Sequence, residues 1–155
     1  MERILALDFG KKRIGLALSD PLGLTAQGLE TFERTRIRDD LAGLQQIAQR
    51  HGVTRLLLGN PLQMSGDESK QSEKAREFGE RLRQATGLPV DYWDERYTTV
   101  LANQVLSEAR VTLEKRKAQV DKIAAMILLE DYLEHRRFQR AAETEPHAED
   151  QEAGQ

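Results

Sequence analysis

The chain has 155 residues, of which 39% are hydrophobic and 32% charged, a composition typical of one soluble globular domain. The absence of cysteine excludes disulfides and thiolate metal sites, and no apolar run is long enough to span a bilayer. The net charge of −3 argues against a uniformly basic nucleic-acid-binding surface, but it leaves room for local basic clusters.

The first half of the chain reads as a strand hairpin followed by a helix and one further strand. In chain order, the predicted elements are strands over residues 3–8, 13–19 and about 24–32, a helix over 36–49 and a strand over 54–58. The strands are apolar runs, and the helix carries apolar residues at helical spacing. Gly10 supplies the turn of the hairpin, and Gly52 ends the helix.

The second half alternates helices with one strand and ends in a polar tail. The predicted elements are a loop over 61–69, a helix over 70–86, a strand over 90–94, a helix from Thr98 or Thr99 to about 110, a basic loop over 111–116 and a helix over 117–137. Gly87 and Pro89 end the first of these helices. Residues 138–155 hold five acidic residues and one base, which favours a disordered acidic tail.

This order predicts an α/β fold with one domain over residues 1–137. A hairpin followed by alternating helices and strands gives a mixed five-stranded sheet flanked by helices, with the first three strands antiparallel and the last two parallel to the first. Ligands bind such sheets beyond the carboxyl ends of the strands. Because no signal-peptide pattern precedes the first strand, the expected location is cytoplasmic.

Three acidic residues stand in surroundings where an unpartnered carboxylate is rare. Asp8 closes the first strand, Glu95 follows the strand of the second half, and Asp121 lies on the apolar face of the last helix. Three converging carboxylates would bind one or two hard divalent cations, as in a metal-dependent phosphoryl-transfer site. Each acid also has a purely structural alternative. Asp8 would cap a turn, and Glu95 would be a residue at a helix start. Asp121 would form an ion pair with Lys117 or Lys122.

Basic residues near these acids form a second candidate feature. The candidates for nucleic-acid contacts are Lys11, Lys12, Arg13, Arg96, Lys115, Arg116 and Lys117. Runs of charge are usually solvated surface, but cations beside metal-binding carboxylates would hold the phosphates of a polyanion. Asp94 is the main competitor of Glu95, because side chains alternate along a strand and only one of the two can face a metal.

Four segments of the chain, taken in order, form a recognisable set. They are Asp8-Phe9-Gly10 with Arg13-Ile14-Gly15-Leu16-Ala17, Gly59-Asn60-Pro61-Leu62, Asp94-Glu95-Arg96-Tyr97-Thr98-Thr99 and Val120-Asp121-Lys122-Ile123-Ala124-Ala125. In order and spacing they resemble the YqgF (RuvX) family, over residues 3 to about 134. The resemblance implies a ribonuclease H-like fold related to the RuvC-type Holliday-junction resolvases, and it places the family's acidic triad on Asp8, Glu95 and Asp121. Two departures affect loop contacts rather than the triad: Asn60 replaces an apolar residue, and residues 111–117 are less rich in glycine and basic residues than in the family.

The resemblance also implies a function. It implies a metal-dependent endonuclease, with Mg²⁺ or Mn²⁺ held by the triad in a two-metal mechanism, that processes the 5′ end of the 16S ribosomal RNA precursor during ribosome biogenesis. The expected partner is nucleic acid, with structured RNA favoured over branched DNA, together with ribosomal precursor particles. The alternatives are a resolvase of Holliday-junction DNA, which would need a dimer, and a non-catalytic RNA-binding assembly factor. A resemblance of the Asp8-Phe9-Gly10 segment to sugar kinases carries less weight, because 155 residues leave no room for their second domain.

Overall fold

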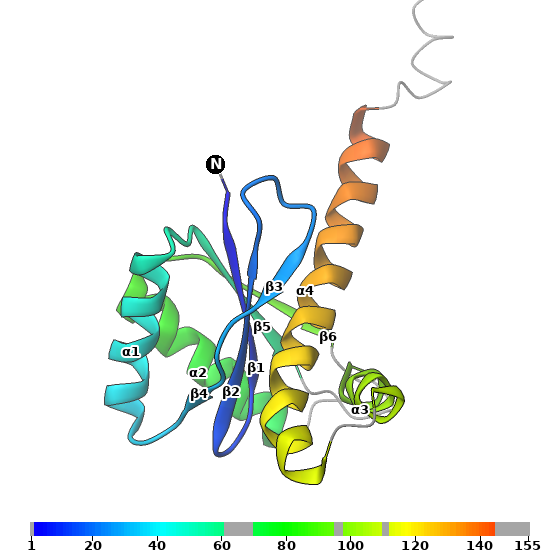
Figure 1. Cartoon of the computed structure of the whole chain (residues 1–155). Helices are drawn as coiled ribbons and strands as arrows, with labels where there is room; N and C mark the ends of the chain where they lie inside the picture. Colours follow the sequence, from blue (N-terminus) through cyan, green and yellow to red (C-terminus); the bar gives the residue numbers. More distant parts are fainter. Residues whose placement is uncertain (1, 61–69, 95–97, 110–111, 145–155) are drawn as a thin grey trace, which may run out of the picture.

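The computed structural model describes residues 2–60, 70–94, 98–109 and 112–144. Its elements, in chain order, are β1 (Ile4–Phe9), β2 (Arg13–Ser19), β3 (Ala26–Gly28), β4 (Phe32–Glu33), α1 (Ile37–Arg50), β5 (Arg55–Asn60), α2 (Lys70–Thr86), β6 (Val90–Asp94), α3 (Thr98–Glu108) and α4 (Leu113–Thr144). Figure 1 shows α1 and α2 on one face of the central sheet and α4, with α3 beside it, on the other. Within the described ranges, no helix is long and apolar enough to cross a membrane.

The sheet has the predicted mixture of strand directions. Its order is β3-β2-β1-β5-β6, with β1–β2 and β2–β3 antiparallel and β1–β5 and β5–β6 parallel. The predicted strand over 24–32 is instead two short strands, β3 and β4, both paired with β2, so the sheet has six strands rather than five. Residues 29–31 lie outside both strands, although the backbone N–H of Leu29 still donates to the carbonyl of Leu16 in β2 at 2.9 Å.

The two faces of the sheet bury two separate cores. Along β1, Leu5 and Leu7 pack with α1 and α2, whereas Ile4 and Ala6 pack with residues of α4 such as Leu128. This alternation is the two-residue period of a strand buried on both faces. The same alternation places Asp8, the next even-numbered residue of β1, on the α4 side of the sheet.

The last helix is longer than the sequence analysis predicted. Residues 111–116 were expected to be a loop and residues 138–155 a tail, but α4 begins at Leu113 and runs to Thr144. The basic run at its start consists of strong helix formers, and a polar stretch at a helix end needs no apolar face to stay helical. Residues 145–155 lie outside the described residues, so the prediction of a disordered tail is left to that segment.

A buried ion pair fixes the start of α1 to the turn between β1 and β2. Asp40 is fully buried, accepting from the backbone N–H of Thr35 at 2.9 Å and from Nε of Arg34 at 3.3 Å. The same guanidinium donates to the carbonyl of Gly10 at 3.0 Å and lies 4.5 Å from the ring centre of Phe9. The carboxylate of Asp40 therefore holds the guanidinium of Arg34, and this guanidinium joins the start of α1 to the β1–β2 turn.

Replacing Asp40 with alanine is expected to lower the free energy of unfolding by about 2–3 kcal/mol, because a buried partner is removed while the guanidinium stays only partly exposed. Chemical denaturation of both proteins measures the difference. Asp39→Ala is the matched control, since Asp39 is 62% exposed and its ion pair with Arg36 lies on the helix surface. Equal losses for the two variants would contradict the structural role given to Asp40.

Candidate active site

Asp8 and Asp121 lie on either side of Gly15, although they are far apart in the sequence. Asp8 of β1 is the antiparallel partner of Gly15 in β2, so their side-chain positions face the same side of the sheet. A Cβ atom added to Gly15 would lie 1.9 Å from the backbone oxygen of Asp121 and 2.9 Å from its Cβ. The glycine thus lets α4 rest directly on β2, and this approach puts Asp121 over the strand residue that pairs with Asp8.

The carboxylate of Asp121 has a cationic partner in the folded chain. Nε of Arg13 donates to its Oδ2 at 3.1 Å, and both side chains are partly exposed, at 37% and 22%. The sequence analysis considered Lys117 and Lys122 as partners for this acid, both from its own helix. The actual partner comes from β2, two residues from Gly15 and on the same side of the strand.

The third predicted carboxylate, Glu95, lies outside the described residues. Its competitor Asp94 ends β6 and is exposed. Earlier in that strand, Asp91 accepts a hydrogen bond from Tyr132 of α4, and Trp93 packs edge-on against the same ring. Strand alternation therefore puts Asp94 on the face opposite α4, away from the other two carboxylates.

The predicted basic residues fall into two groups around the carboxylates. Lys11 and Lys12 are exposed in the turn that joins β1 to β2, and Arg13 follows them into the strand. Lys115 is exposed and Arg116 half-buried in the first turn of α4, and Nε of Arg116 is buried with no hydrogen-bond partner among the described residues. Arg96 and the side chain of Lys117 lie outside the described part of the chain.

The chemistry of the two described carboxylates fits a hard divalent cation. Oxygen ligands suit Mg²⁺ and Mn²⁺. No group of three or more acidic or histidine side chains suited to a metal occurs in residues 2–60, 70–94, 98–109 and 112–144. A third ligand would have to come from another segment, and Glu95 is the predicted one.

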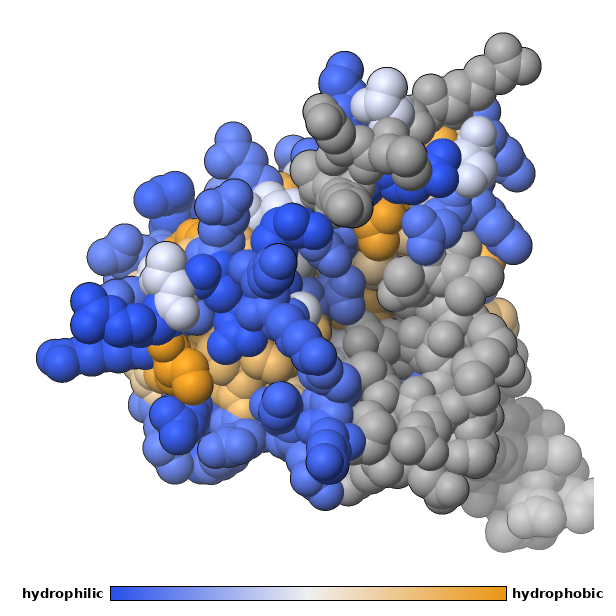
Figure 2. Space-filling view, turned by 90° about the horizontal axis from the view of Figure 1, so that it is seen from below, coloured by the Kyte–Doolittle hydropathy of each residue, from blue (hydrophilic) through white to orange (hydrophobic). Residues whose placement is uncertain are grey.

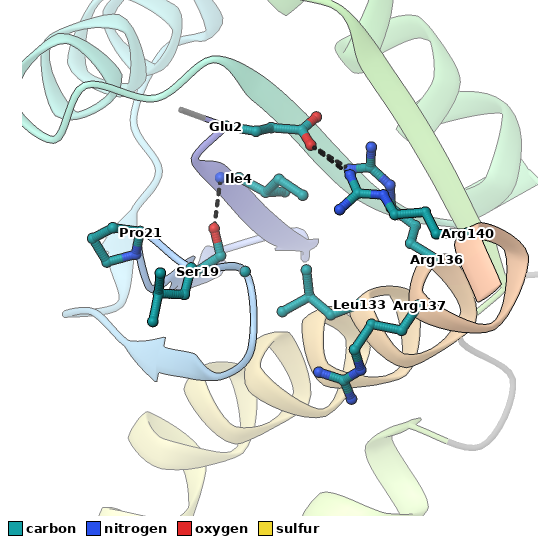
Figure 3. Close-up of a pocket in the computed structure, with 10 residues that line it drawn as sticks. Glu2, Ile4, Ser19, Pro21, Leu133, Arg136, Arg137 and Arg140 are labelled. Carbon is teal, nitrogen blue, oxygen red and sulfur yellow. Dashed lines mark hydrogen bonds and ion pairs between the residues drawn. The ribbon is translucent and has the colours of Figure 1, made fainter. Parts of the chain in front are cut away.

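A second group of basic side chains lines a hollow of about 250 Å³ at the opposite end of the sheet (Figure 3). Arg136, Arg137 and Arg140 reach it from the last turns of α4, and Arg136 pairs with Glu2 at 2.8 Å. Partial burial raises the pKa of Glu2, but hydrogen bonds from Arg136 and Arg55 outweigh it and hold that pKa below its ordinary value. This cluster is not among the predicted site residues, because the predicted helix ends at residue 137 and only a longer helix puts the three arginines on neighbouring positions.

Known structures with the same arrangement identify the class of domain. Thermus thermophilus RuvC in complex with a Holliday junction substrate superposes with a TM-score of 0.58 at 14% identity, covering 88% of this chain and 96% of that one. The fowlpox virus resolvase in complex with Holliday junction DNA gives a TM-score of 0.56 at 14% identity, covering 86% and 97%. At this identity the likeness establishes the fold, and the chain is a ribonuclease H-like domain.

Sequence comparison then identifies the family. The RuvX family model, described as Holliday junction resolvase, matches residues 2–135. A Koribacter versatilis protein named "Putative pre-16S rRNA nuclease" is 49% identical over 138 residues, covering 89% of this chain and 90% of that protein. A Myxococcus xanthus protein of the same name is 43% identical over 148 residues, 96% of each chain. The chain belongs to the RuvX family, as its four sequence segments predicted.

Proposed function

We propose that this protein is a metal-dependent endonuclease that cleaves the 16S ribosomal RNA precursor near its 5′ end. The observation that supports the proposal is that Asp8 pairs with Gly15 at the carboxyl end of β1 while Asp121 of α4 packs directly over the same glycine. Relatives that bear the name of such a nuclease, at 43–49% identity over most of the chain, support this substrate over branched DNA.

Asp8, Asp121 and Glu95 would hold Mg²⁺ or Mn²⁺. When bound, one or two such ions lower the pKa of a water molecule for attack on a phosphodiester and neutralise charge on the phosphate. Arg13 orients the carboxylate of Asp121 and compensates its charge in the metal-free protein. This fits a site that must keep two acids close together before a cation arrives.

The basic residues around the carboxylates would position the nucleic acid. Lys11 and Lys12 stand in the turn beside Asp8, while Lys115 and Arg116 begin the helix that carries Asp121. Cations on two sides of the site can hold phosphates on either side of the scissile bond.

The proposal is tested by cleavage of three substrates: a 16S precursor transcript with its 5′ extension, a single-stranded RNA of equal length and a four-way DNA junction. Each is incubated with the protein in Mg²⁺, in Mn²⁺ and in EDTA, and the products are mapped on sequencing gels. We expect cleavage of the precursor in the presence of either metal and none in EDTA. Symmetric cleavage of the junction alone would favour a DNA resolvase, and binding without cleavage would favour a non-catalytic assembly factor.

Removing residues 145–155 is expected to leave metal-dependent cleavage intact. This segment holds four acidic residues and no basic one, so it competes with nucleic acid for the basic residues of the domain. Its removal should tighten RNA binding by about two- to threefold at low ionic strength and have no effect at high salt, where such interactions are screened. Fluorescence anisotropy at two salt concentrations measures this, and loss of cleavage on truncation would show that the tail belongs to the active domain.

A further inference from the structure

A cavity on the other face of the sheet opens at the same end as the carboxylates. It has a volume of about 360 Å³ and lies between the β1–β2 turn, α1 and α2. Phe9, the residue after Asp8, is part of its lining, and strand alternation points these two neighbours to opposite faces. Figure 2, which views this end from below, shows apolar surface enclosed by hydrophilic side chains.

The lining combines aromatic and aliphatic surface with positive charge. Phe9 stacks on Phe78 with ring centres 4.6 Å apart, and Ile37, the first residue of α1, is 41% exposed beside them. Lys74 and Arg81 contribute cationic side chains from α2. The rest of the lining is Lys11, Arg34, Gln71 and Glu77.

The guanidinium of Arg34 is held at this surface by contacts within the protein. It lies 4.5 Å from the ring centre of Phe9 and 5.5 Å from that of Phe78, and it is held by the buried carboxylate of Asp40. Its positive charge therefore stays at the wall of the cavity. A flat apolar group with a neighbouring anion matches both properties of the lining, and a nucleotide is such a ligand.

A basic groove connects this cavity to the carboxylates. A second hollow, lined by Lys11, Lys12, Arg13, Glu33, Arg34 and Thr35, shares two of its residues with the cavity. Arg13 at its far end is the partner of Asp121. A strand with a phosphate at the carboxylates could therefore cross the turn over a continuous row of cations and reach the cavity.

We infer that this cavity binds an unpaired nucleobase of the substrate strand, with the adjoining phosphates on Lys74 and Arg81. The inference rests on the proposed function, because it assumes that the strand crossing the turn is a nuclease substrate. It adds a requirement that the strand be single where it leaves the active site, since a base that is paired in a duplex is not available to enter the cavity.

The test measures binding in EDTA, so that no cleavage occurs, with the full-length protein and a fluorescent single-stranded RNA. A ribose-phosphate oligomer of the same length without bases serves as the second ligand. We expect wild type to bind the RNA about tenfold more tightly than the abasic oligomer, because stacking of one base is of that order. Ile37→Ser should weaken RNA binding by about three- to tenfold and leave binding of the abasic oligomer unchanged.

Two matched variants separate the base contact from general effects. Val105→Ser removes an apolar residue of similar exposure, 48%, on α3 and should not change RNA binding. Lys74→Ala should weaken binding of both ligands about equally and reduce the salt dependence of that binding. Arg50→Ala, which removes a basic residue at the end of α1, should change neither quantity. Melting temperatures confirm that all variants are folded.

The outcomes distinguish the inference from the proposed function. The cavity is not a base site if wild type binds both ligands equally or binds neither. It is also not a base site if Ile37→Ser binds RNA as tightly as wild type does. In each case, metal-dependent cleavage of the precursor can still be observed, so the proposed function is tested separately. If base-dependent binding requires Ile37 but no substrate is cleaved in Mg²⁺ or Mn²⁺, the cavity stands and the nuclease proposal fails.

Discussion

Asn substitution at Asp8 or at Asp121 is expected to reduce the cleavage rate by about a thousandfold or more. Under the proposed function, each change removes a negatively charged oxygen ligand, and the metal contribution to a phosphoryl-transfer transition state is worth several kcal/mol. Single-turnover cleavage at saturating RNA measures the chemical step, while RNA binding in EDTA should change by less than about threefold. Glu95→Gln should have the same effect, and Asp94→Asn is the control, since strand alternation puts Asp94 on the other face.

The same variants should separate metal binding from folding. Asp121→Asn loses its ion pair with Arg13, which is partly exposed and therefore worth only about 0–1 kcal/mol. Without metal, both variants should melt close to wild type, whereas Mg²⁺ should raise the melting temperature of wild type alone. If Asp94→Asn abolishes cleavage and Glu95→Gln does not, the third ligand is Asp94 and not Glu95. If all three substitutions at the predicted triad leave cleavage intact, the protein is not a nuclease of this type.

Much of this arrangement was predictable because it depends on local patterns. The apolar run that ends in Asp8 specifies both a buried strand and the end at which its acid lies. The apolar stripe on the last helix predicts that Asp121 faces the sheet, and Ala124 and Ala125 beside it are fully buried, as the stripe requires. Two-residue alternation also predicts that Asp94 and Glu95 face opposite sides, and the contact of Trp93 with Tyr132 of α4 then places Asp94 on the other face.

Other features depend on contacts between distant segments and have no local signature. The partner of Asp121 is Arg13, more than one hundred residues away, whereas the helix offered lysines at nearer positions. The stacking of Arg34 on Phe9 and Phe78 joins three elements, so the sequence shows only a basic residue in a basic stretch. The start of α4 at Leu113 differs from the predicted start at residue 117, because the charged run at 113–117 favours helix over the predicted loop.

Replacing Gly15 with alanine is expected to damage both the fold and the site. The new methyl group would meet the backbone of Asp121, at 1.9 Å from its oxygen and 2.3 Å from its carbonyl carbon. A side chain can change rotamer to relieve such a contact, but a helix backbone must move, taking the neighbouring core residues Ala124, Ala125 and Leu128 with it. We expect a loss of about 3 kcal/mol or more in the free energy of unfolding, at the upper end of the cost of overpacking.

Gly28→Ala provides the matched control, because Gly28 lies under the same helix on the adjacent strand β3. There an added Cβ would meet side-chain atoms only, those of Lys122 and Met126, which are flexible and can move aside. Urea denaturation should show a clearly smaller loss for Gly28→Ala, and cleavage should persist in that variant. For Gly15→Ala, cleavage should fall even at temperatures where circular dichroism shows a folded protein, since displacement of α4 moves Asp121 away from Asp8. Wild-type stability and cleavage in Gly15→Ala would mean that the helix does not rest on this glycine and that the two carboxylates are not brought together by it.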